Sequence, residues 1–200
     1  MIGLDKYTFS FTASGLRVNE IQKVIRHLKF GEKLDVVNDL GGGKSATGER
    51  ILSDLKKRID LLSQKETSLF LEGDFQFKKQ IAFLSVCRAY LFIREFVIEV
   101  VREKYLVFDY QLTEGEFLTF YRRKHEEHSE MDSLTEGTQY KIKQITFKLL
   151  EQGGIIDSAK TKIIQPQLLD ESLIGALKEV DSEWLKIFLF SDLDIQNTLV

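Results

Sequence analysis

The pattern of apolar and polar positions identifies one dominant segment, residues 81–101 (IAFLSVCRAYLFIREFVIEVV). Besides one serine, its only polar residues are Arg88, Arg94, Glu95 and Glu99. The segment is long enough to span a bilayer, but a charge near the centre of a membrane helix costs roughly 2.5–3.5 kcal/mol, whereas each large apolar side chain returns only about 0.3–0.6 kcal/mol. We therefore expect a buried helix in a protein core and not a membrane span.

Charged residues of this segment, together with the arginine that directly follows it, recur at helical spacing. The positions are Arg88, Glu95, Glu99 and Arg102. They are seven, four and three residues apart, so a helix places them on one stripe, whereas a strand would scatter them over both faces. The stripe either reaches solvent or pairs with charges inside the protein. We expect this helix to be the centre around which the other elements pack.

The flanking sequence predicts further helices with recognisable ends. Asn19 begins an amphipathic segment that ends at Gly31, and the single proline of the chain argues for long helices. Thr113 is followed by glutamate three residues later, which is the spacing of a capping box, and Ser133 is followed by Glu136 in the same way. These signals predict two consecutive helices after residue 113, the second ending near Gly153.

Two β-prone runs, residues 155–156 and 163–164, flank the polar tip DSAKTK and predict a small β-hairpin. Helix, turn, helix and hairpin is the order of a winged helix. The expected fold class is mainly α: a compact helical protein around a central buried helix, with a winged-helix-like helix-turn-helix plus a small β-hairpin in the C-terminal half. We expect one compact unit with three parts, residues 1–110, the winged-helix-like residues 111–166 and the C-terminal helices of residues 167–200.

Charge distribution changes the functional picture more than total charge does. The net charge of -3 by itself argues against indiscriminate nucleic-acid binding. However, residues 17–33 hold five bases against two acids, and residues 138–165 hold five lysines against two acids. Residues 166–200 hold seven acids against two lysines. Such a polarised molecule can present a basic face to phosphate.

The second of the two consecutive helices has an outward face suited to contact with a nucleic-acid groove. Its ammonium groups can bind phosphate, and its glutamine amide can pair with an adenine edge. The alternative is that the lysines only solvate a helix face, because lysine is common on surfaces. Together with the hairpin tip, the preceding helix and the N-terminal basic stretch, the candidate nucleic-acid-binding residues are Tyr140, Lys141, Gln144, Lys148, Lys160, Lys162, Arg122, Arg123, Arg17, Lys23 and Arg26.

Nothing in the sequence predicts an enzyme, a metal site, a cofactor or a small-molecule substrate. The GGGKS stretch lacks the glycine that a P-loop needs at the position of Asn38, so we expect a flexible loop there. His125 and His128 are three residues apart without a third ligand nearby, and we interpret them as solvated histidines at a frayed helix end. Cys87 is expected to be a buried hydrophobe. The N-terminus has no signal-peptide pattern, which favours a cytoplasmic location.

Five stretches in order carry a resemblance to a known family: YTFSFTASGLRVNEIQKVI, ERILSDLKKRIDLL, QIAFLSVCRAYLFIREFVIEVV, LTEGEFLTFYRRK and LTEGTQYKIKQITFKLLEQGGII. Over residues 7–189 the chain resembles the BrxA family (DUF1819-type), small proteins of BREX (bacteriophage exclusion) defence systems. The resemblance implies an all-helical cytoplasmic protein, similar to the antitermination factor NusB, that binds nucleic acid and acts beside other BREX components. It implies no individual site residue.

The leading hypothesis is therefore a non-enzymatic accessory component of a BREX system that binds double-stranded DNA. Residues 138–165 would form the main contact surface and residues 17–33 a second one. One alternative is a protein-interaction scaffold of the same system, and another is a NusB-like RNA binder. DNA binding predicts affinity that falls steeply with salt, because each neutralised phosphate releases counterions.

Overall fold

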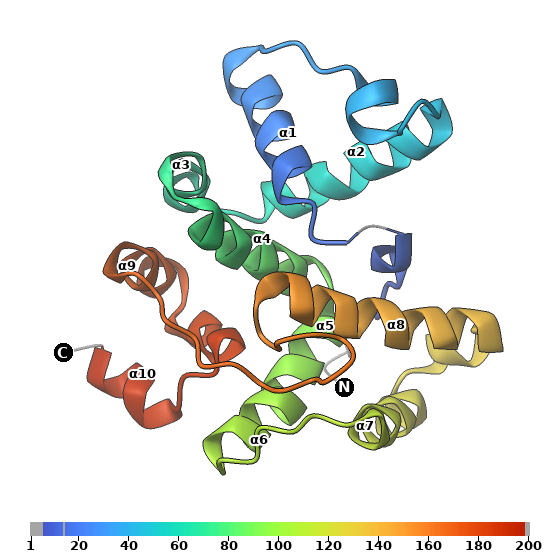
Figure 1. Cartoon of the computed structure of the whole chain (residues 1–200), viewed down its shortest axis with the longest axis vertical. Helices are drawn as coiled ribbons and strands as arrows, with labels where there is room; N and C mark the ends of the chain where they lie inside the picture. Colours follow the sequence, from blue (N-terminus) through green and yellow to red (C-terminus); the bar gives the residue numbers. More distant parts are fainter. Residues whose placement is uncertain (1–5, 14, 199–200) are drawn as a thin grey trace.

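The computed structural model describes residues 6–13 and 15–198, and every regular element in these ranges is a helix (Figure 1). The predicted mainly α fold is confirmed. The α-helices are α1 (Val18–Phe30), α2 (Ser45–Asp60), α3 (Gln64–Glu72), α4 (Phe75–Ala89), α5 (Leu91–Phe96), α6 (Glu103–Leu106), α7 (Glu114–Glu127), α8 (Glu136–Gly153), α9 (Glu171–Val180) and α10 (Asp192–Thr198). Shorter 3-10 or π-helical segments are η1 (Ser10–Ala13), η2 (Val36–Leu40), η3 (Val97–Arg102), η4 (Ser129–Ser133) and η5 (Ser182–Phe188).

A central run of α4, α5, η3 and α6 passes through the middle of the molecule and contains the predicted buried segment (Figure 1). The segment is buried and helical, as predicted, but it does not form one straight helix. The run breaks at Tyr90, where φ is −131° and ψ is 94°, and it continues as a π-helix in η3. The Tyr90 hydroxyl donates to Asp54 of α2 and lies 3.3 Å from the Ser10 hydroxyl oxygen. Contacts with elements distant in sequence therefore hold the break in place.

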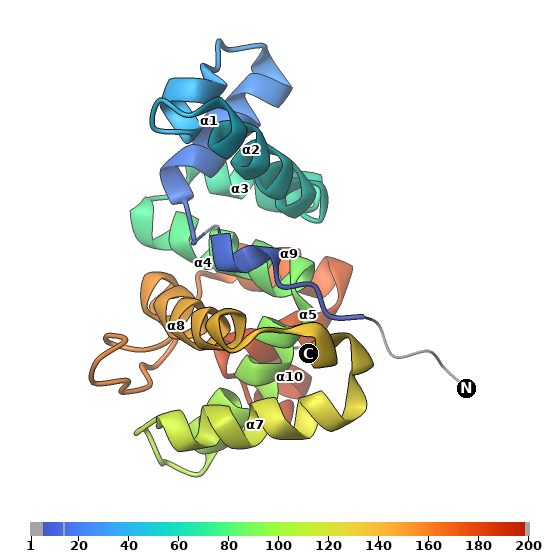
Figure 2. The ribbon, with the colours of Figure 1, turned by 90° about the vertical axis from the view of Figure 1, so that its right-hand side faces the viewer.

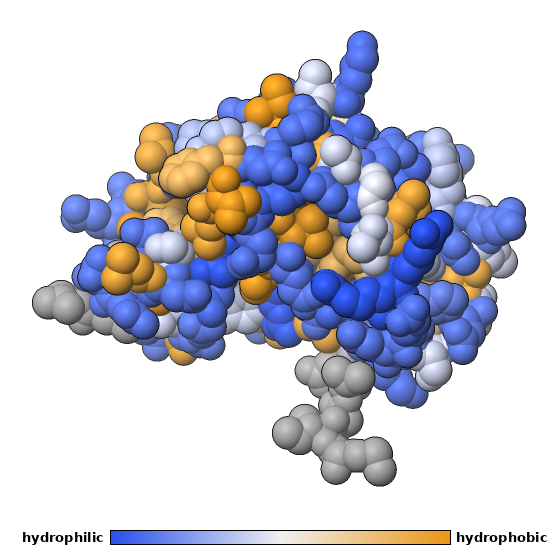
Figure 3. Space-filling model, turned by 90° about the horizontal axis from the view of Figure 1, so that it is seen from below, coloured by the Kyte–Doolittle hydropathy of each residue, from blue (hydrophilic) through white to orange (hydrophobic). Residues whose placement is uncertain are grey.

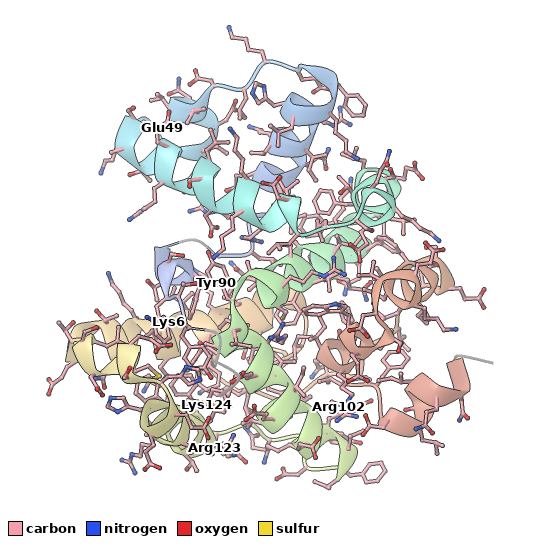
Figure 4. The ribbon with its side chains drawn as sticks, turned by 180° about the vertical axis from the view of Figure 1, so that it is seen from behind. Lys6, Glu49, Tyr90, Arg102, Arg123 and Lys124 are labelled. Atoms are coloured by element: carbon pink, nitrogen blue, oxygen red, sulfur yellow. The ribbon has the colours of Figure 1, made fainter. Side chains whose placement is uncertain are left out.

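The charges of the central stripe pair with residues of other elements, and Glu99 among them is exposed. Arg88 donates to both carboxylate oxygens of Glu66 at 2.6 and 2.7 Å, and both side chains are buried. Glu95 forms an ion pair at 2.7 Å with Lys124 of α7, a residue labelled in Figure 4. Arg102 donates at 2.7 Å to a backbone carbonyl just before α10. The stripe thus ties α3, α7 and the C-terminal helices to the centre.

Close packing of η2 against α2 depends on glycine. A Cβ on Gly48 would lie 2.3 Å from the Val36 carbonyl oxygen, and one on Gly41 would lie 2.2 Å from the Lys44 carbonyl oxygen. Only a residue without a Cβ permits these approaches between backbones. The five-residue η2 is the only helical turn between α1 and α2 in the described chain.

The predicted β-hairpin is wrong, since no strand forms within residues 6–13 and 15–198. Antiparallel contact is limited to two isolated bridges, Ile156 with Ile164 and Gln111 with Ile163. The Asp157 carboxylate accepts hydrogen bonds from the backbone N–H of Ile163 at 2.8 Å and from that of Ser158 at 2.6 Å. Backbone hydrogen bonds from the Asp157 N–H to the Ile163 carbonyl and from the Gln165 N–H to the Ile155 carbonyl, both 2.9 Å, also join the two sides. The segment is therefore a closed turn held by backbone and side-chain bonds and not a strand pair. We call residues 155–165 the return segment, which lies beside α8 in Figure 2.

The C-terminal helices pack back onto the core, as the apolar pattern of the tail predicts. Leu173, Leu177, Leu185 and Phe188 are buried in the same hydrophobic cluster as the central run. The guanidinium groups of Arg88 and Arg94 lie 5.0 and 5.4 Å from the centre of the Trp184 ring, within cation–π range. In the described part of the chain, no helix combines the length and apolar character that crossing a bilayer requires.

Candidate nucleic-acid interface

The core fixes the orientation of α8. The Thr135 hydroxyl accepts from the N–H of Thr138 at 3.2 Å at the start of the helix, and Gly154 ends it with a φ of 78°. The inner face packs on α4, where a Cβ on Gly153 would lie 2.6 Å from the Phe83 ring. The buried inner positions are Ile142, Thr146, Leu149 and Leu150. The opposite face of α8 is therefore held towards solvent.

That outward face carries the four residues predicted for it. Tyr140 is 57% exposed, and Lys141, Gln144 and Lys148 are exposed as well. The Gln144 amide donates to the Tyr140 hydroxyl at 3.1 Å, which connects these two side chains along the helix. Within the described residues, Lys141 and Lys148 form no ion pair. Both ammonium groups are therefore available to an external anion.

A hollow of about 530 Å³, the α8 hollow, lies between α8 and the return segment. Four predicted residues line it: Tyr140, Gln144 and Lys148 from α8, and Lys162 from the return segment. Lys143 and Glu114 line it too, although neither belongs to the predicted set. The structure therefore brings three of the four α8 candidates and one of the two lysines of the return segment to one concave surface, whereas Lys141 and Lys160 do not line it.

Two acidic residues, Glu114 and Glu151, line the α8 hollow, and Glu114 is the one that pairs with its lysines. Its carboxylate lies 2.7 Å from the Lys143 ammonium nitrogen and 3.8 Å from that of Lys162. The hydrogen bond from Lys143 holds the pKa of Glu114 below its usual range, and the charge of Lys162 acts in the same direction. The two ammonium groups also lie over rings, Lys143 at 5.5 Å from the centre of Tyr140 and Lys162 at 5.3 Å from that of Phe147.

Arg17 joins this surface from the other side of α8. It lines a second hollow of about 470 Å³ together with Lys148 and Gln152. Its backbone is left-handed, with a φ of 56°, and its guanidinium pairs with Glu20 at 2.9 Å. The Gln152 side-chain oxygen accepts from the N–H of Leu16 at 2.8 Å, which fixes the chain next to Arg17 against α8. Of the three N-terminal candidates, Arg17 is the one beside α8.

Lys23 and Arg26 lie further along α1 and pair with other residues. Lys23 contacts Asp39 at 2.6 Å, and Arg26 contacts Glu32 at 3.3 Å. The hydrogen bond from Lys23 holds the pKa of Asp39 below its usual range. Neither base lines the α8 hollow or the second hollow. The second predicted contact surface is therefore divided between Arg17 at α8 and an ion-paired end of α1.

The remaining candidates lie around the edge or on another helix face. Lys160 is exposed in the return segment, and its carbonyl oxygen accepts from Lys162 at 3.3 Å. Arg122 is exposed on α7. Arg123 pairs with Glu99 of the central run at 2.5 Å, next to Lys124 in Figure 4. Arg123 thus joins α7 to the centre and does not line the α8 hollow.

The two histidines of the H-E-E-H stretch separate in the structure. His125 pairs with Asp132 at 2.9 Å, whereas His128 is buried and stacks on the Tyr7 ring with 3.8 Å between ring centres. The interpretation of both as solvated is therefore wrong for His128, because the N-terminal aromatic residues cover it. No group of three or more potential metal ligands occurs among the described residues. Cys87 is buried as predicted, and burial raises the pKa of its thiol.

Sequence reasoning missed Lys143 and Glu114 for different reasons. Lys143 follows Tyr140 by three residues, and this spacing puts both side chains on adjacent positions of one helix face. That signal could have added Lys143 to the candidate set. Glu114 lies 29 residues earlier on another helix, so only the tertiary packing brings it to the hollow.

Comparisons with known proteins agree with this fold. A sequence model of the BrxA family matches residues 5–181. A relative described as BREX protein BrxA, from Bacillus cereus (strain H3081.97), is 24% identical over 159 residues, which cover 79% of this chain and 80% of the relative. A crystal structure of an uncharacterized protein from Magnetospirillum magneticum has a similar fold, with a TM-score of 0.77 and 16% identity over 92% of this chain and 98% of that chain. The family model covers most of the sequence, and the chain therefore belongs to the BrxA family.

Proposed function

We propose that this protein is a non-enzymatic, duplex-DNA-binding component of a BREX defence system, and that the outward face of α8 is its main contact surface. The observation that carries the proposal is the α8 hollow, where Tyr140, Gln144, Lys148 and Lys162 converge from two separate segments. Membership of the BrxA family, and the name of the Bacillus cereus relative, support the BREX context.

The geometry of α8 suits a DNA major groove. The helix has 18 residues, which corresponds to a length of roughly 27 Å, and an α-helix fits a groove about 12 Å wide. Lys141 and Lys148 would contact phosphates on the groove walls, and the Gln144 amide would face base edges. Arg17 would extend the phosphate contacts beyond the C-terminal half of α8.

The elements around α8 support a reduced winged-helix arrangement as part of the proposal. α7, η4 and α8 follow one another, and the return segment bridges back through Ile164 to Ile156 and through Ile163 to Gln111, just before α7. In this arrangement α8 would be the recognition helix, and Lys160 at the tip of the return segment would contact the flanking backbone.

The test is an electrophoretic mobility series with duplex DNA at about 50 and 200 mM salt, a range over which phosphate contacts weaken strongly. We expect Lys141→Glu combined with Lys148→Glu to weaken binding at the lower salt by roughly tenfold or more, since two attractive charges become repulsive. Lys44→Glu combined with Lys56→Glu is the matched control, because both lysines are exposed on or next to α2. Equal effects of the two double variants would refute the role of α8.

RNA of the same length, used as a competitor, distinguishes the NusB-like alternative. Tyr140 gives this alternative a specific basis, because an exposed aromatic ring can stack on an unpaired base. Preferential displacement of DNA by single-stranded RNA would favour an RNA-binding function. If neither nucleic acid is retained while other defence proteins co-purify with the chain, the scaffold alternative is favoured.

Other BREX components are proposed as protein partners on the surface away from the α8 hollow. Figure 1 places α9 and α10 on the opposite side of the molecule from α7, and these helices belong to the acidic C-terminal part of the sequence. The underside in Figure 3 exposes apolar side chains among polar ones. The most exposed large apolar side chains of the molecule include Leu168 at 87%, Phe108 at 79% and Leu193 at 65%. On α9 and α10 themselves, Val180 is 50% and Leu193 is 65% exposed. Removal of these two side chains should reduce co-purification and leave DNA affinity unchanged.

A further inference from the structure

The position of Glu114 in the α8 hollow resembles that of a bound anion. Its carboxylate faces two ammonium groups that come from different segments, Lys143 of α8 and Lys162 of the return segment. A carboxylate and a phosphodiester each carry one negative charge and accept hydrogen bonds from the same donors. In the free protein, the Glu114 carboxylate therefore neutralises these two ammonium groups, and a backbone phosphate could do so equally well.

The two lysines are fixed more firmly than the glutamate. The side chains of Lys143 and Lys162 are 21% and 14% exposed, and their ammonium groups lie over the rings of Tyr140 and Phe147. The Glu114 side chain is 54% exposed. An ion pair with such an exposed partner is weak, because water and salt screen it. The two lysines therefore keep their positions in the hollow, whereas the Glu114 carboxylate can be exchanged for another anion.

Displacement of Glu114 would not disturb the helix that carries it. Glu114 is the first residue of α7, but the cap of α7 consists of Thr113 and Glu116, whose side chains and backbone N–H groups bond to each other. Its carboxylate forms hydrogen bonds or ion pairs only with the two lysines among the described residues. The side chain can therefore rotate into solvent while α7 stays intact.

We propose that Lys143 and Lys162 form a binding subsite for a backbone phosphate of the nucleic acid, and that Glu114 occupies this subsite in the free protein and leaves it on binding. This inference rests on the proposed function of α8. It adds two contacts to the surface and assigns Glu114 the role of a competing internal anion. Each binding event then has to displace a carboxylate, which lowers the affinity of the wild-type protein.

The variant that tests the subsite is Glu114→Gln, compared with Glu126→Gln. Glu126 is an exposed residue of the same helix, so both variants change net charge equally. We expect Glu114→Gln to bind duplex DNA about three- to tenfold more tightly at low salt, with nearly the same slope of log affinity against log salt, because both lysines contact the phosphate in either complex. Glu126→Gln should change the affinity less than about twofold, since it frees no lysine.

A double-variant cycle tests whether the gain in DNA affinity requires Lys143. In the Glu114→Gln background, Lys143→Gln should remove most of the gain, whereas Lys56→Gln on α2 should leave it in place. Thermal unfolding followed by circular dichroism verifies that all variants are folded. Single-stranded RNA of equal length in a parallel series identifies the source of the phosphate, because the affinity gain appears with the nucleic acid that occupies the subsite.

Two results would overturn the inference, and they differ in what else they refute. If the wild-type protein binds DNA through Lys141 and Lys148 but Glu114→Gln behaves like Glu126→Gln, the subsite is refuted and the proposed function stands. If the wild-type protein retains neither duplex DNA nor RNA at about 50 mM salt, where phosphate contacts are strong, both proposals fail.

Discussion

Two ion pairs of this protein consist of the same kinds of charged group but lie in different surroundings. Glu66 and Arg88 meet inside the molecule, with side chains that are 0% and 6% exposed, and they join α3 to α4. Glu114 and Lys143 meet at the α8 hollow, with side chains that are 54% and 21% exposed. The buried pair is stacked against Trp184 through its arginine and has no access to an external ion. The exposed pair lies at a concave surface where an anion can enter.

The two pairs differ chiefly in burial. A buried pair is costly to break because the remaining charge stays without a partner in a medium of low polarity. An exposed pair contributes little to stability because water replaces either partner. The charges of the central run therefore join it to neighbouring helices, and Lys141 and Lys148 of α8 stay exposed to solvent.

Removal of the buried arginine is the largest effect that we predict. Arg88→Met should lower the free energy of unfolding by about 3–5 kcal/mol, since it leaves the Glu66 carboxylate buried without its partner. Urea unfolding at neutral pH measures this loss. Glu114→Gln is the comparison and should change stability by less than about 1 kcal/mol. Equal losses for the two variants would remove the distinction between the pairs.

The contact that seats α8 on the core should give the next largest effect. Gly153→Ala would place a Cβ 2.6 Å from the Phe83 ring, and such overpacking costs about 1–3 kcal/mol. The matched control is Gly137→Ala near the other end of α8, where the nearest atom to the added Cβ is the Thr135 hydroxyl oxygen at 4.0 Å. The control should be neutral or stabilising because alanine favours helices. Thermal unfolding compares the two, and a destabilised control with an unaffected Gly153→Ala would contradict this packing.

The cap of α7 should contribute a smaller amount. Thr113→Ala removes the hydroxyl that accepts from the N–H of Glu116 and should cost about 1 kcal/mol. Thr119→Ala, on the exposed side of the same helix, should stay within about 0.5 kcal/mol of wild type. Urea unfolding resolves this difference, and identical values for both threonines would show that the capping box is unimportant.

The smallest predicted effect is the pH dependence of the exposed pair. The pKa of Glu114 is lowered in the folded protein, chiefly by the hydrogen bond from Lys143. Its stabilising contribution is therefore present above the usual glutamate pKa of about 4.3 and is lost as the pH falls through the lowered value. The stability difference between wild type and Glu114→Gln should shrink below about pH 4.3. A difference that grows on acidification would contradict the sign of the shift.

Local sequence signals predicted individual helix ends, with mixed success. The capping box of Thr113 and Glu116 forms as predicted, and Gly31 ends α1 in a left-handed conformation. The predicted box at Ser133 does not form, because η4 incorporates this residue and Thr135 caps α8 instead. The predicted start at Asn19 is also replaced, since α1 follows the left-handed Arg17. Two possible capping residues that lie two positions apart can start a helix about equally well, and tertiary contacts determine which of them caps it.

Features that depend on distant contacts could not be predicted from local patterns. At the break, the Tyr90 hydroxyl donates to Asp54, 36 residues earlier, and the apolar pattern runs through this position without interruption. The outward face of α8 followed from helical periodicity alone. The positions of Lys162 and Glu114 beside this face depend on how the return segment and α7 pack against α8. Periodicity indicates which way a helix faces, but not which charges meet it.

The measurement that tests the central claim most directly is the salt dependence of duplex affinity for wild type and for Lys141→Gln combined with Lys148→Gln. If α8 binds phosphates through these two lysines, the slope of log affinity against log salt should become shallower by about 1.8, which is about 0.9 for each lost contact. Lys44→Gln combined with Lys56→Gln should leave the slope unchanged. An unchanged slope in the α8 variant would contradict the assignment of this helix as the binding surface.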